Sequence, residues 1–503
     1  MNLQNPYVLV GIIIFTILYY TIFKKSQWLL TLIVSYALYY YLEKYAVVYI
    51  VITTISIYLL GAKIESVIEA EGKKQGKIKS KKYLILGLLI NFGILFGLKY
   101  LGLLNLFGNF TFDFKSIVAP LGISFYTFKA VSYLVDIYRS KYKAQKNFLK
   151  FASFVAYFPA FLQGPIDKYD DLSKTLYAEK DFSWQNLSRG LYLIIFGLMK
   201  KTVVADRLVE PISNVVSNYT SYQGSVLFLA MFVFGIQIYA DFSGGIDIVR
   251  GFSKILGIEL SENFNSPYLA DSVAEYWRRW HMTLGAFMRE YVFYPMSLSK
   301  TFTKINRKSR KKFGAKYGKI FTLLISTLVV YILIGAWHGA RVISLLFGLY
   351  YGVVISLSLI LEGVRNSVDE KLKISENIKY VFKIIWVSLI TTVGRYFSKA
   401  DTAKELWQMI KYTAGNFFGE NFLRNFYSAM AMTKVGYLVV GAGVLVMIFA
   451  AYYKEREGDF FQKLERLKPL SLYLLLVIVL GLTLVFGIIG GDITKMEFVY
   501  QKY

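Results

Sequence analysis

Two histidines offer the clearest chemistry in this sequence. They are His281 and His338, the only histidines in the chain, and each directly follows a tryptophan. His338 lies in the segment GAWHGA at the end of an apolar run, where an ionisable side chain is costly and is a functional candidate by default. A histidine can take the proton of a hydroxyl while that hydroxyl attacks a thioester or ester carbonyl. We interpret His338 as a candidate base and His281 as its polar support, with neutral structural histidines as the alternative.

Aromatic and basic residues surround the two histidines. They are Trp277, Arg278, Arg279, Trp280 and Trp337. Arginine side chains can hold an anionic acyl donor or orient a catalytic group. The same mixture of arginine and tryptophan is also typical of a helix at the membrane interface, so both interpretations stay open.

A second polar segment, YADFSGG at 239–245, ends another apolar run and contains Asp241 and Ser243. The two glycines after Ser243 permit the close approach of another backbone. The segment is not a phosphate-binding loop, because neither a Lys-Ser or Lys-Thr pair nor a flanking strand accompanies it. We expect Asp241 and Ser243 to support the site. A structural acid paired with a nearby arginine is an equal alternative for Asp241.

Several kinds of active site are excluded by residues that the sequence lacks. The chain has no cysteine, so it has no disulfide, thiolate metal site or cysteine nucleophile. Two histidines without an adjacent carboxylate motif rarely bind a metal, and the nucleophile elbow of serine hydrolases is missing. We therefore predict no metal and no bound cofactor.

Long apolar runs must position these residues. The chain has 503 residues, of which 55% are hydrophobic and 18% charged, and its mean hydropathy is +0.45. About 20 apolar residues cross a bilayer as a helix, which satisfies its own backbone hydrogen bonds in lipid. The sequence therefore predicts an all-α, polytopic transmembrane helical bundle in one domain, 1–503. The predicted spans are 6–23, 28–42, 46–62, 83–105, 117–137, 148–163, 188–205, 224–241, 320–337, 342–362, 378–397, 434–452 and 470–490.

Basic residues indicate the orientation in the membrane. The net charge is +25, and lysine and arginine collect in 71–82, 300–319 and 454–468, which we interpret as loops on the cytoplasmic side. One further span then places the tail 492–503 outside. The basic inner face also suits anionic partners such as acidic lipids, coenzyme A or an acidic carrier protein. Nucleic acid is not an expected partner, because no soluble basic domain is present.

The segment 237–298 resembles the core of the membrane-bound O-acyltransferase (MBOAT) family, and the nearest branch looks like the alginate O-acetylases and teichoic-acid D-alanyl transferases. The motifs that carry the resemblance are DFSG at 241–244, NFNSPY at 263–268, RWH at 279–281, the stretch 291–295 and GAWHGA at 335–340. Segments 119–139 and 157–166 and the stretch GRYFSKADTAKELWQMI are similar to the same branch. The resemblance therefore covers most of the chain.

This resemblance implies a fold and a reaction. The fold is a ring of roughly 11–13 membrane helices around a thinned centre, with a core at about 117–400 and a tunnel that joins the two sides. The reaction is acyl transfer, with His338 as the essential histidine and His281 at the other recurrent position. The acyl donor enters from the cytosol, and the chain is a multi-pass protein of the bacterial plasma membrane.

The last residues, EFVYQKY at 497–503, resemble the Phe-x-Tyr-x-x-aromatic C-terminal motif of members that export acetyl groups. By this resemblance Tyr500 is an acyl relay to an extracytoplasmic partner protein, acetyl-CoA is the donor, and an envelope or exported polysaccharide is the acceptor. An aromatic tail that anchors at the membrane interface is the alternative. The rival functions are D-alanyl transfer to teichoic acid from a carrier protein and transport, although the paired halves of a transporter are not visible.

Overall fold

The apolar runs of the sequence form helices throughout the described part of the chain. The computed structural model describes residues 6–101, 119–161, 163–361 and 374–488, together with 363 and 367. Within these residues there is no β-strand, and one isolated bridge pairs Phe264 with Trp280. The predicted all-α class is confirmed. The predicted outer tail 492–503, including Tyr500, lies outside the described residues.

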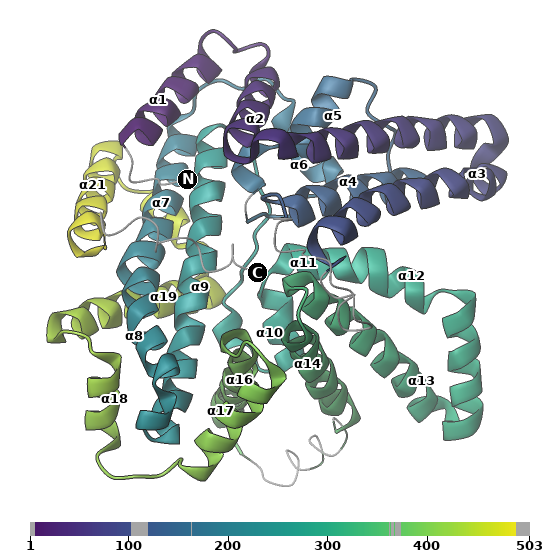
Figure 1. Cartoon of the computed structure of the whole chain (residues 1–503). Helices are drawn as coiled ribbons and strands as arrows, with labels where there is room; N and C mark the ends of the chain where they lie inside the picture. Colours follow the sequence, from purple (N-terminus) through teal and green to yellow (C-terminus); the bar gives the residue numbers. More distant parts are fainter. Residues whose placement is uncertain are drawn as a thin grey trace.

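The order of the helices can be followed by colour in Figure 1. Their bounds are α1 Pro6–Tyr20, α2 Gln27–Glu43, α3 Val47–Lys99, α4 Ile123–Tyr138, α5 Phe148–Val155, α6 Tyr169–Leu176, α7 Trp184–Leu198, α8 Asp206–Ser217, α9 Gly224–Ile255, α10 Val273–Arg279, α11 Met282–Phe287, α12 Tyr294–Ser297, α13 Lys300–His338, α14 Val342–Ile360, α16 Glu376–Lys399, α17 Ala403–Gly415, α18 Phe422–Met430, α19 Lys434–Glu457, α20 Phe460–Leu464 and α21 Pro469–Phe486. Two π-helices, Met199–Ala205 and Met288–Phe293, join α7 to α8 and α11 to α12.

Among the described residues, six helical stretches are long and apolar enough to cross a membrane, which supports the predicted polytopic bundle. They are Gln27–Lys99, Gly224–Ile255, Tyr317–His338, Val342–Ile360, Lys434–Glu457 and Pro469–Phe486. Two other predicted spans are less regular. The span 148–163 becomes α5, which ends before Pro159, and the span 188–205 passes from α7 into a π-helix.

The basic stretches 71–82 and 300–319, which we expected to be loops, are helical instead (Figure 1). The expectation was wrong because a single glycine reverses the chain in each stretch. The reversal lies at Gly72 in α3 (φ 74°) and at Gly314 in α13 (φ 78°), and glycine adopts such positive φ values readily. Four residues after each of them, a second glycine lets the two arms touch: a Cβ there would lie 2.5 Å or 2.3 Å from the backbone of the opposite arm.

Small residues bring the helices around the candidate histidines into close contact. A Cβ on Gly335 of α13 would lie 2.3 Å from the carbonyl oxygen of Ser344 in α14. A Cβ on Gly244 of α9 would lie 2.7 Å from the carbonyl oxygen of Gly197 in α7, so the close approach expected at Gly244 is confirmed. Such small-residue contacts are typical of helix pairs in membranes.

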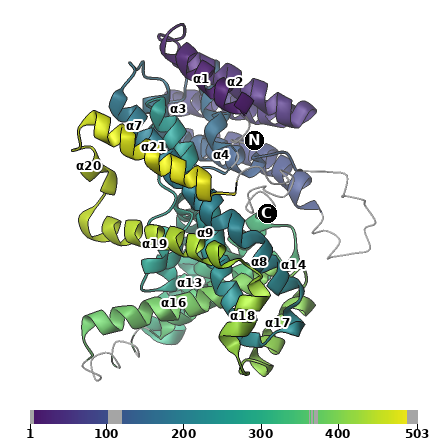
Figure 2. The same cartoon turned by 90° about the vertical axis from the view of Figure 1, so that its left-hand side faces the viewer.

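Helix α9 is the central element of the bundle. It packs against α7, α8, α16 and α17, while α21 packs against α7 and α19 against the π-helix Met199–Ala205. Figure 2 shows α19 and α21 on the outside of this arrangement. The segment between α9 and α13 contains the short helices α10 to α12, and these lie beside α13, α14 and α16. Residues far apart in the sequence therefore converge next to α9.

Candidate active site

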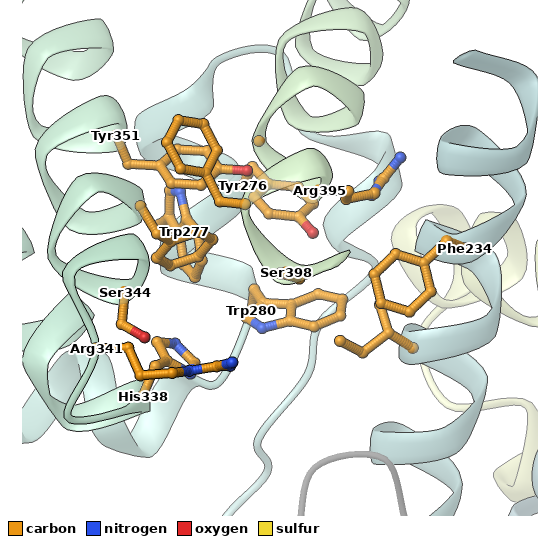
Figure 3. Close-up of a pocket in the computed structure, with 14 residues that line it drawn as sticks. Phe234, Tyr276, Trp277, Trp280, His338, Arg341, Ser344, Tyr351, Arg395 and Ser398 are labelled. Carbon is orange, nitrogen blue, oxygen red and sulfur yellow. The ribbon is translucent and has the colours of Figure 1, made fainter. Parts of the chain in front are cut away.

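Two cavities meet at His338. The first lies between α9, α10, α14 and α16, and we call it the Arg395 cavity (Figure 3). The second lies between α10, α11 and α13, and we call it the His281 cavity. Trp277, Trp280 and His338 line both cavities. A molecule in either cavity therefore reaches the same imidazole.

His338 is the last residue of α13, and the close packing of α13 against α14 places it. Its ring centroid lies 5.0 Å from the Trp337 ring and 5.2 Å from the Phe347 ring. Figure 3 shows Ser344 and Arg341 beside the imidazole, with Trp280 between this group and Arg395. The imidazole thus has aromatic walls and a polar rim.

His281 is held by its backbone and by one amide side chain. It precedes α11 in the left-handed conformation (φ 47°), which costs free energy for a residue other than glycine. Its Nδ1 lies 3.1 Å from Oδ1 of Asn263, which also accepts hydrogen bonds from the backbone and hydroxyl of Thr283 at 3.1 and 2.9 Å. Because that oxygen is an acceptor, Nδ1 carries the proton of the neutral ring and Nε2 is its basic nitrogen.

Trp337 links the two histidines. Its ring lies 5.5 Å from the His281 ring, and the next residue in the chain is His338. Phe125 packs against both the Trp337 ring and the His281 ring, with centroid distances of 6.0 and 6.4 Å. These aromatic contacts fix the relative positions of the two imidazoles.

The structure brings together most of the residues predicted for the site. His338, Trp277 and Trp280 line both cavities, and His281 and Arg278 line the His281 cavity. Arg278 is exposed at the cavity wall. Trp337 completes the group through its contact with His281.

Three other predicted residues lie outside the two cavities. Arg279 pairs with Glu275 at 2.9 Å and with Glu455 at 2.7 Å. Asp241 pairs with Lys201 at 2.7 Å, so a lysine is a partner of this acid, where the alternative interpretation named an arginine. The π-helix Met199–Ala205 is the reason, because it turns two successive lysines toward α9: Lys201 reaches Asp241, and Lys200 donates to the Ser243 hydroxyl at 3.1 Å.

Arg395 is a wall residue that the sequence analysis missed. It is only 7% exposed, and its guanidinium donates to Thr392 at 3.0 Å and to the Tyr268 hydroxyl at 3.4 Å. Gly235 of α9 makes room for it, since a Cβ there would lie 2.0 Å from the Arg395 Cζ. A cation inside an apolar run is costly, so the criterion that singled out His338 also applies to Arg395.

Arg289 and Asn263 were also missed. Arg289 lines the His281 cavity next to Arg278, and both border a further cavity that contains Lys168. No sequence signal marks Arg289, because the chain reversal at His281 decides where it lies. Asn263 stands in the motif NFNSPY, but its contact with His281 joins residues that only the fold brings together.

The arrangement is suited to general-base chemistry on two molecules that meet in the middle of a bundle. A half-buried base lines both cavities, and Arg278 and Arg289 line the His281 cavity. Among the residues that the structure describes, no group of three histidine or carboxylate side chains is placed to hold a metal ion.

Comparison with known proteins gives a consistent result. The family model described as MBOAT, membrane-bound O-acyltransferase family, matches residues 140–398, which include both histidines. A probable alginate O-acetylase of Pseudomonas aeruginosa is 26% identical over 462 residues, covering 90% of this chain and 81% of that protein. A peptidoglycan O-acetyltransferase of Helicobacter pylori is 28% identical over 305 residues, 55% of each chain. A teichoic acid D-alanyltransferase of Bacillus subtilis is 26% identical over 249 residues, 48% of this chain and 59% of that protein.

Proposed function

Because this chain belongs to the membrane-bound O-acyltransferase family, it is an integral membrane acyltransferase, and we propose that it moves acetyl groups from acetyl-CoA for the O-acetylation of an exported polysaccharide. One observation carries the proposal: His338 lines two cavities at once. A donor in one cavity and an acceptor in the other meet at a single base. The similarity to alginate and peptidoglycan O-acetylating enzymes supports acetyl as the acyl group and a polysaccharide as the final acceptor.

The proposed chemical step uses His338 as a general base. A hydroxyl oxygen of the acceptor attacks the thioester carbonyl carbon while its proton passes to the imidazole. The carbon–oxygen π bond opens to give a tetrahedral oxyanion. When the carbonyl reforms, the carbon–sulfur bond breaks, and the departing thiolate takes the proton back from the imidazolium. The products are an oxygen ester and free thiol, and the histidine returns to its neutral form.

The donor is proposed to occupy the His281 cavity. Arg278 and Arg289 line it, and Lys168 lies in the neighbouring cavity that these two arginines also border. Arginine pairs well with phosphate oxygens, which coenzyme A and the phosphopantetheine arm of a carrier protein both have. A chain of contacts ties this end to the lysine-rich hairpin of α3: Lys77 donates to the Arg139 carbonyl at 3.0 Å, and Arg139 donates to the carbonyl of Glu290 at 2.9 Å. The positive-inside rule places that hairpin in the cytosol.

The acceptor is proposed to enter through the Arg395 cavity. Its rim carries Arg341, which pairs with Asp401 at 3.1 Å in an exposed position. The predicted outer tail would supply Tyr500 as the first acceptor hydroxyl, and an extracytoplasmic partner protein would complete the transfer to the polysaccharide. The aromatic walls of this cavity suit a tyrosine side chain.

D-alanyl transfer is the second candidate, because the similarity to the D-alanyltransferase spans about half of this chain. Its donor is a carrier protein rather than a small thioester. The cationic wall of the His281 cavity suits both donors, so the two functions differ in the acyl group that reaches the envelope.

The test measures ester-linked groups on the envelope polymers of cells that express the wild type, His338→Ala or Tyr500→Phe. We expect base-labile acetate to fall to background in His338→Ala and in Tyr500→Phe, at equal amounts of membrane-inserted protein. Loss of ester-linked D-alanine with unchanged acetate would instead support the second candidate. Unchanged levels of both groups in His338→Ala would overturn the acyltransfer mechanism through this histidine.

A further inference from the structure

A lysine holds the segment that carries His338 from outside the two cavities. Lys99 is the last residue of α3, and its Nζ donates a hydrogen bond to the carbonyl oxygen of Trp337 at 2.6 Å. The same ammonium lies 5.5 Å from the centre of the Trp337 ring and 5.7 Å from that of Tyr100. Lys99 is not among the residues that line either cavity. Its contacts with the site are to Trp337, the residue before His338.

The bonded carbonyl is one that the helix itself leaves without a partner. The last four carbonyls of an α-helix have no N–H from the following turn, and Trp337 belongs to that last turn of α13. A lysine at a helix C-terminus both satisfies such a carbonyl and interacts favourably with the helix dipole. The contact joins residues 238 positions apart in the sequence, so it fixes the end of α13 to the end of α3.

The position of this hydrogen bond matters for the imidazole. The Trp337 carbonyl belongs to the same planar peptide unit as the nitrogen of His338. An ammonium that fixes the carbonyl oxygen therefore also fixes the plane from which the His338 side chain departs. The side chain of Trp337 also contacts His281, since the two rings lie 5.5 Å apart. Lys99 thus holds a residue whose ring lies beside both histidines.

We infer that Lys99 is a positioning residue for acyl transfer, which sets the orientation of the His338 imidazole through the Trp337 carbonyl and ring. The inference depends on the proposed role of His338 and adds a residue from a distant helix to that site. A displacement of about 1 Å in a reacting group can cost on the order of 100-fold in rate. Loss of Lys99 should therefore lower the rate of the chemical step without weakening the binding of the donor in the His281 cavity.

The experiment uses the purified full chain in lipid nanodiscs and radiolabelled acetyl-CoA, and follows acetyl transfer per folded protein. Lys99→Met keeps the length of the side chain and removes its hydrogen bond and charge. We expect kcat to fall roughly 10- to 100-fold while KM for acetyl-CoA stays within about twofold. Lys99→Arg can still donate to the carbonyl and should recover kcat to within about fivefold of the wild type.

A matched control is Lys150→Met. Lys150 is a partly buried lysine whose ammonium lies over Trp28 and Tyr177, at 5.6 and 5.4 Å, outside both cavities. We expect this variant to keep the wild-type kcat and KM. If Lys150→Met keeps the wild-type kcat while Lys99→Met loses it, the loss comes from the Lys99–Trp337 contact and not from the removal of any cation–aromatic contact.

Two results would overturn the inference. One is a wild-type kcat in Lys99→Met. The other is an equal loss of total acetyl transfer in Lys99→Met and Lys99→Arg that matches the loss of folded protein. Lys99 would then be a residue that stabilises the fold and does not position His338. His338→Ala, measured in the same assay, separates this inference from the proposed function. Full transfer in His338→Ala contradicts the function itself, whereas its loss alongside full transfer in Lys99→Met contradicts only the role of Lys99.

Discussion

The pair Trp280-His281 and the pair Trp337-His338 lie in the same region of the molecule, but different elements hold them. His281 sits at a chain reversal with φ 47° and is bonded to Asn263. His338 ends a long helix that packs against α14, and it lines both cavities, whereas His281 lines one. Two identical dipeptides therefore differ in what their imidazoles can reach.

This difference separates a reacting group from a supporting one. An imidazole whose Nδ1 already pairs with a fixed amide has one nitrogen committed to the protein. Its surroundings determine where the ring lies and which tautomer it adopts. An imidazole at the junction of two cavities can serve both a donor and an acceptor. Variants of His338, His281, Asn263 and Arg279 test this difference, and we expect their effects on acetyl transfer to decrease in that order.

The largest effect is expected for His338→Ala. General-base catalysis contributes roughly 100- to 10,000-fold to a rate, so we expect kcat for acetyl transfer to fall by about that factor. The measurement is acetyl transfer from radiolabelled acetyl-CoA in nanodiscs, with the amount of folded protein fixed by size-exclusion chromatography. If His338→Ala loses less activity than His281→Ala, the assignment of the two roles is reversed.

A smaller effect is expected for His281, and the type of replacement should matter. Asparagine tolerates the left-handed conformation better than alanine does, so His281→Asn should keep the chain reversal while it removes the ring. We expect kcat to fall roughly 10- to 100-fold in His281→Asn, with thermal stability close to that of the wild type, and stability to fall further in His281→Ala. Equal melting temperatures for the two variants would argue against the strain at this position.

Asn263→Ala should affect stability more than activity. Its side-chain oxygen accepts from Thr283 twice and pairs with His281, so alanine leaves buried donors without a partner. We expect a loss of about 2–3 kcal/mol in the free energy of unfolding, followed by thermal denaturation in detergent, and a fall in kcat of about tenfold. Asn263→Asp keeps an acceptor at this position and serves as the control. If Asn263→Ala is as stable as the wild type, the hydrogen bonds of Asn263 do not hold His281 in place.

The smallest effect is expected for Arg279→Gln. Arg279 pairs with Glu275 and Glu455 and lies outside both cavities, so acetyl transfer should stay within about twofold of the wild type. The neighbouring variant Arg278→Gln is the contrast, because Arg278 lines the His281 cavity. It should raise KM for acetyl-CoA several-fold with little change in kcat. The placement of the donor would have to be revised if Arg279→Gln raised KM instead.

The sequence located much of this site because rare residues stand out in an apolar chain. His281, His338 and the tryptophans beside them were found in this way, and all of them gather around the two cavities or the Trp337 ring. The same criterion applies to Arg395 and Lys99, which are cations in or at the end of apolar runs. Its weakness is shown by Asp241, which also ends an apolar run but is paired with Lys201 outside the cavities.

The basic hairpins show a second limit of pattern reasoning. Clusters of lysine indicate which side of the membrane a segment faces, but they do not indicate whether it is a loop. Lysine is a good helix former, and a single glycine with positive φ is enough to reverse the chain. The two arms of α3 and of α13 therefore stay helical up to Gly72 and Gly314.

The long apolar runs predict a helical membrane protein, because lipid offers backbone groups no hydrogen-bond partner and the runs lack the alternation of barrel strands. The sequence also identified the two histidines as the groups able to carry a proton. The fold determines that His338 lines two cavities and that His281 is bonded to Asn263. The reason is that these positions depend on contacts between distant segments, such as Lys99 with Trp337 across 238 positions, and no local pattern encodes them.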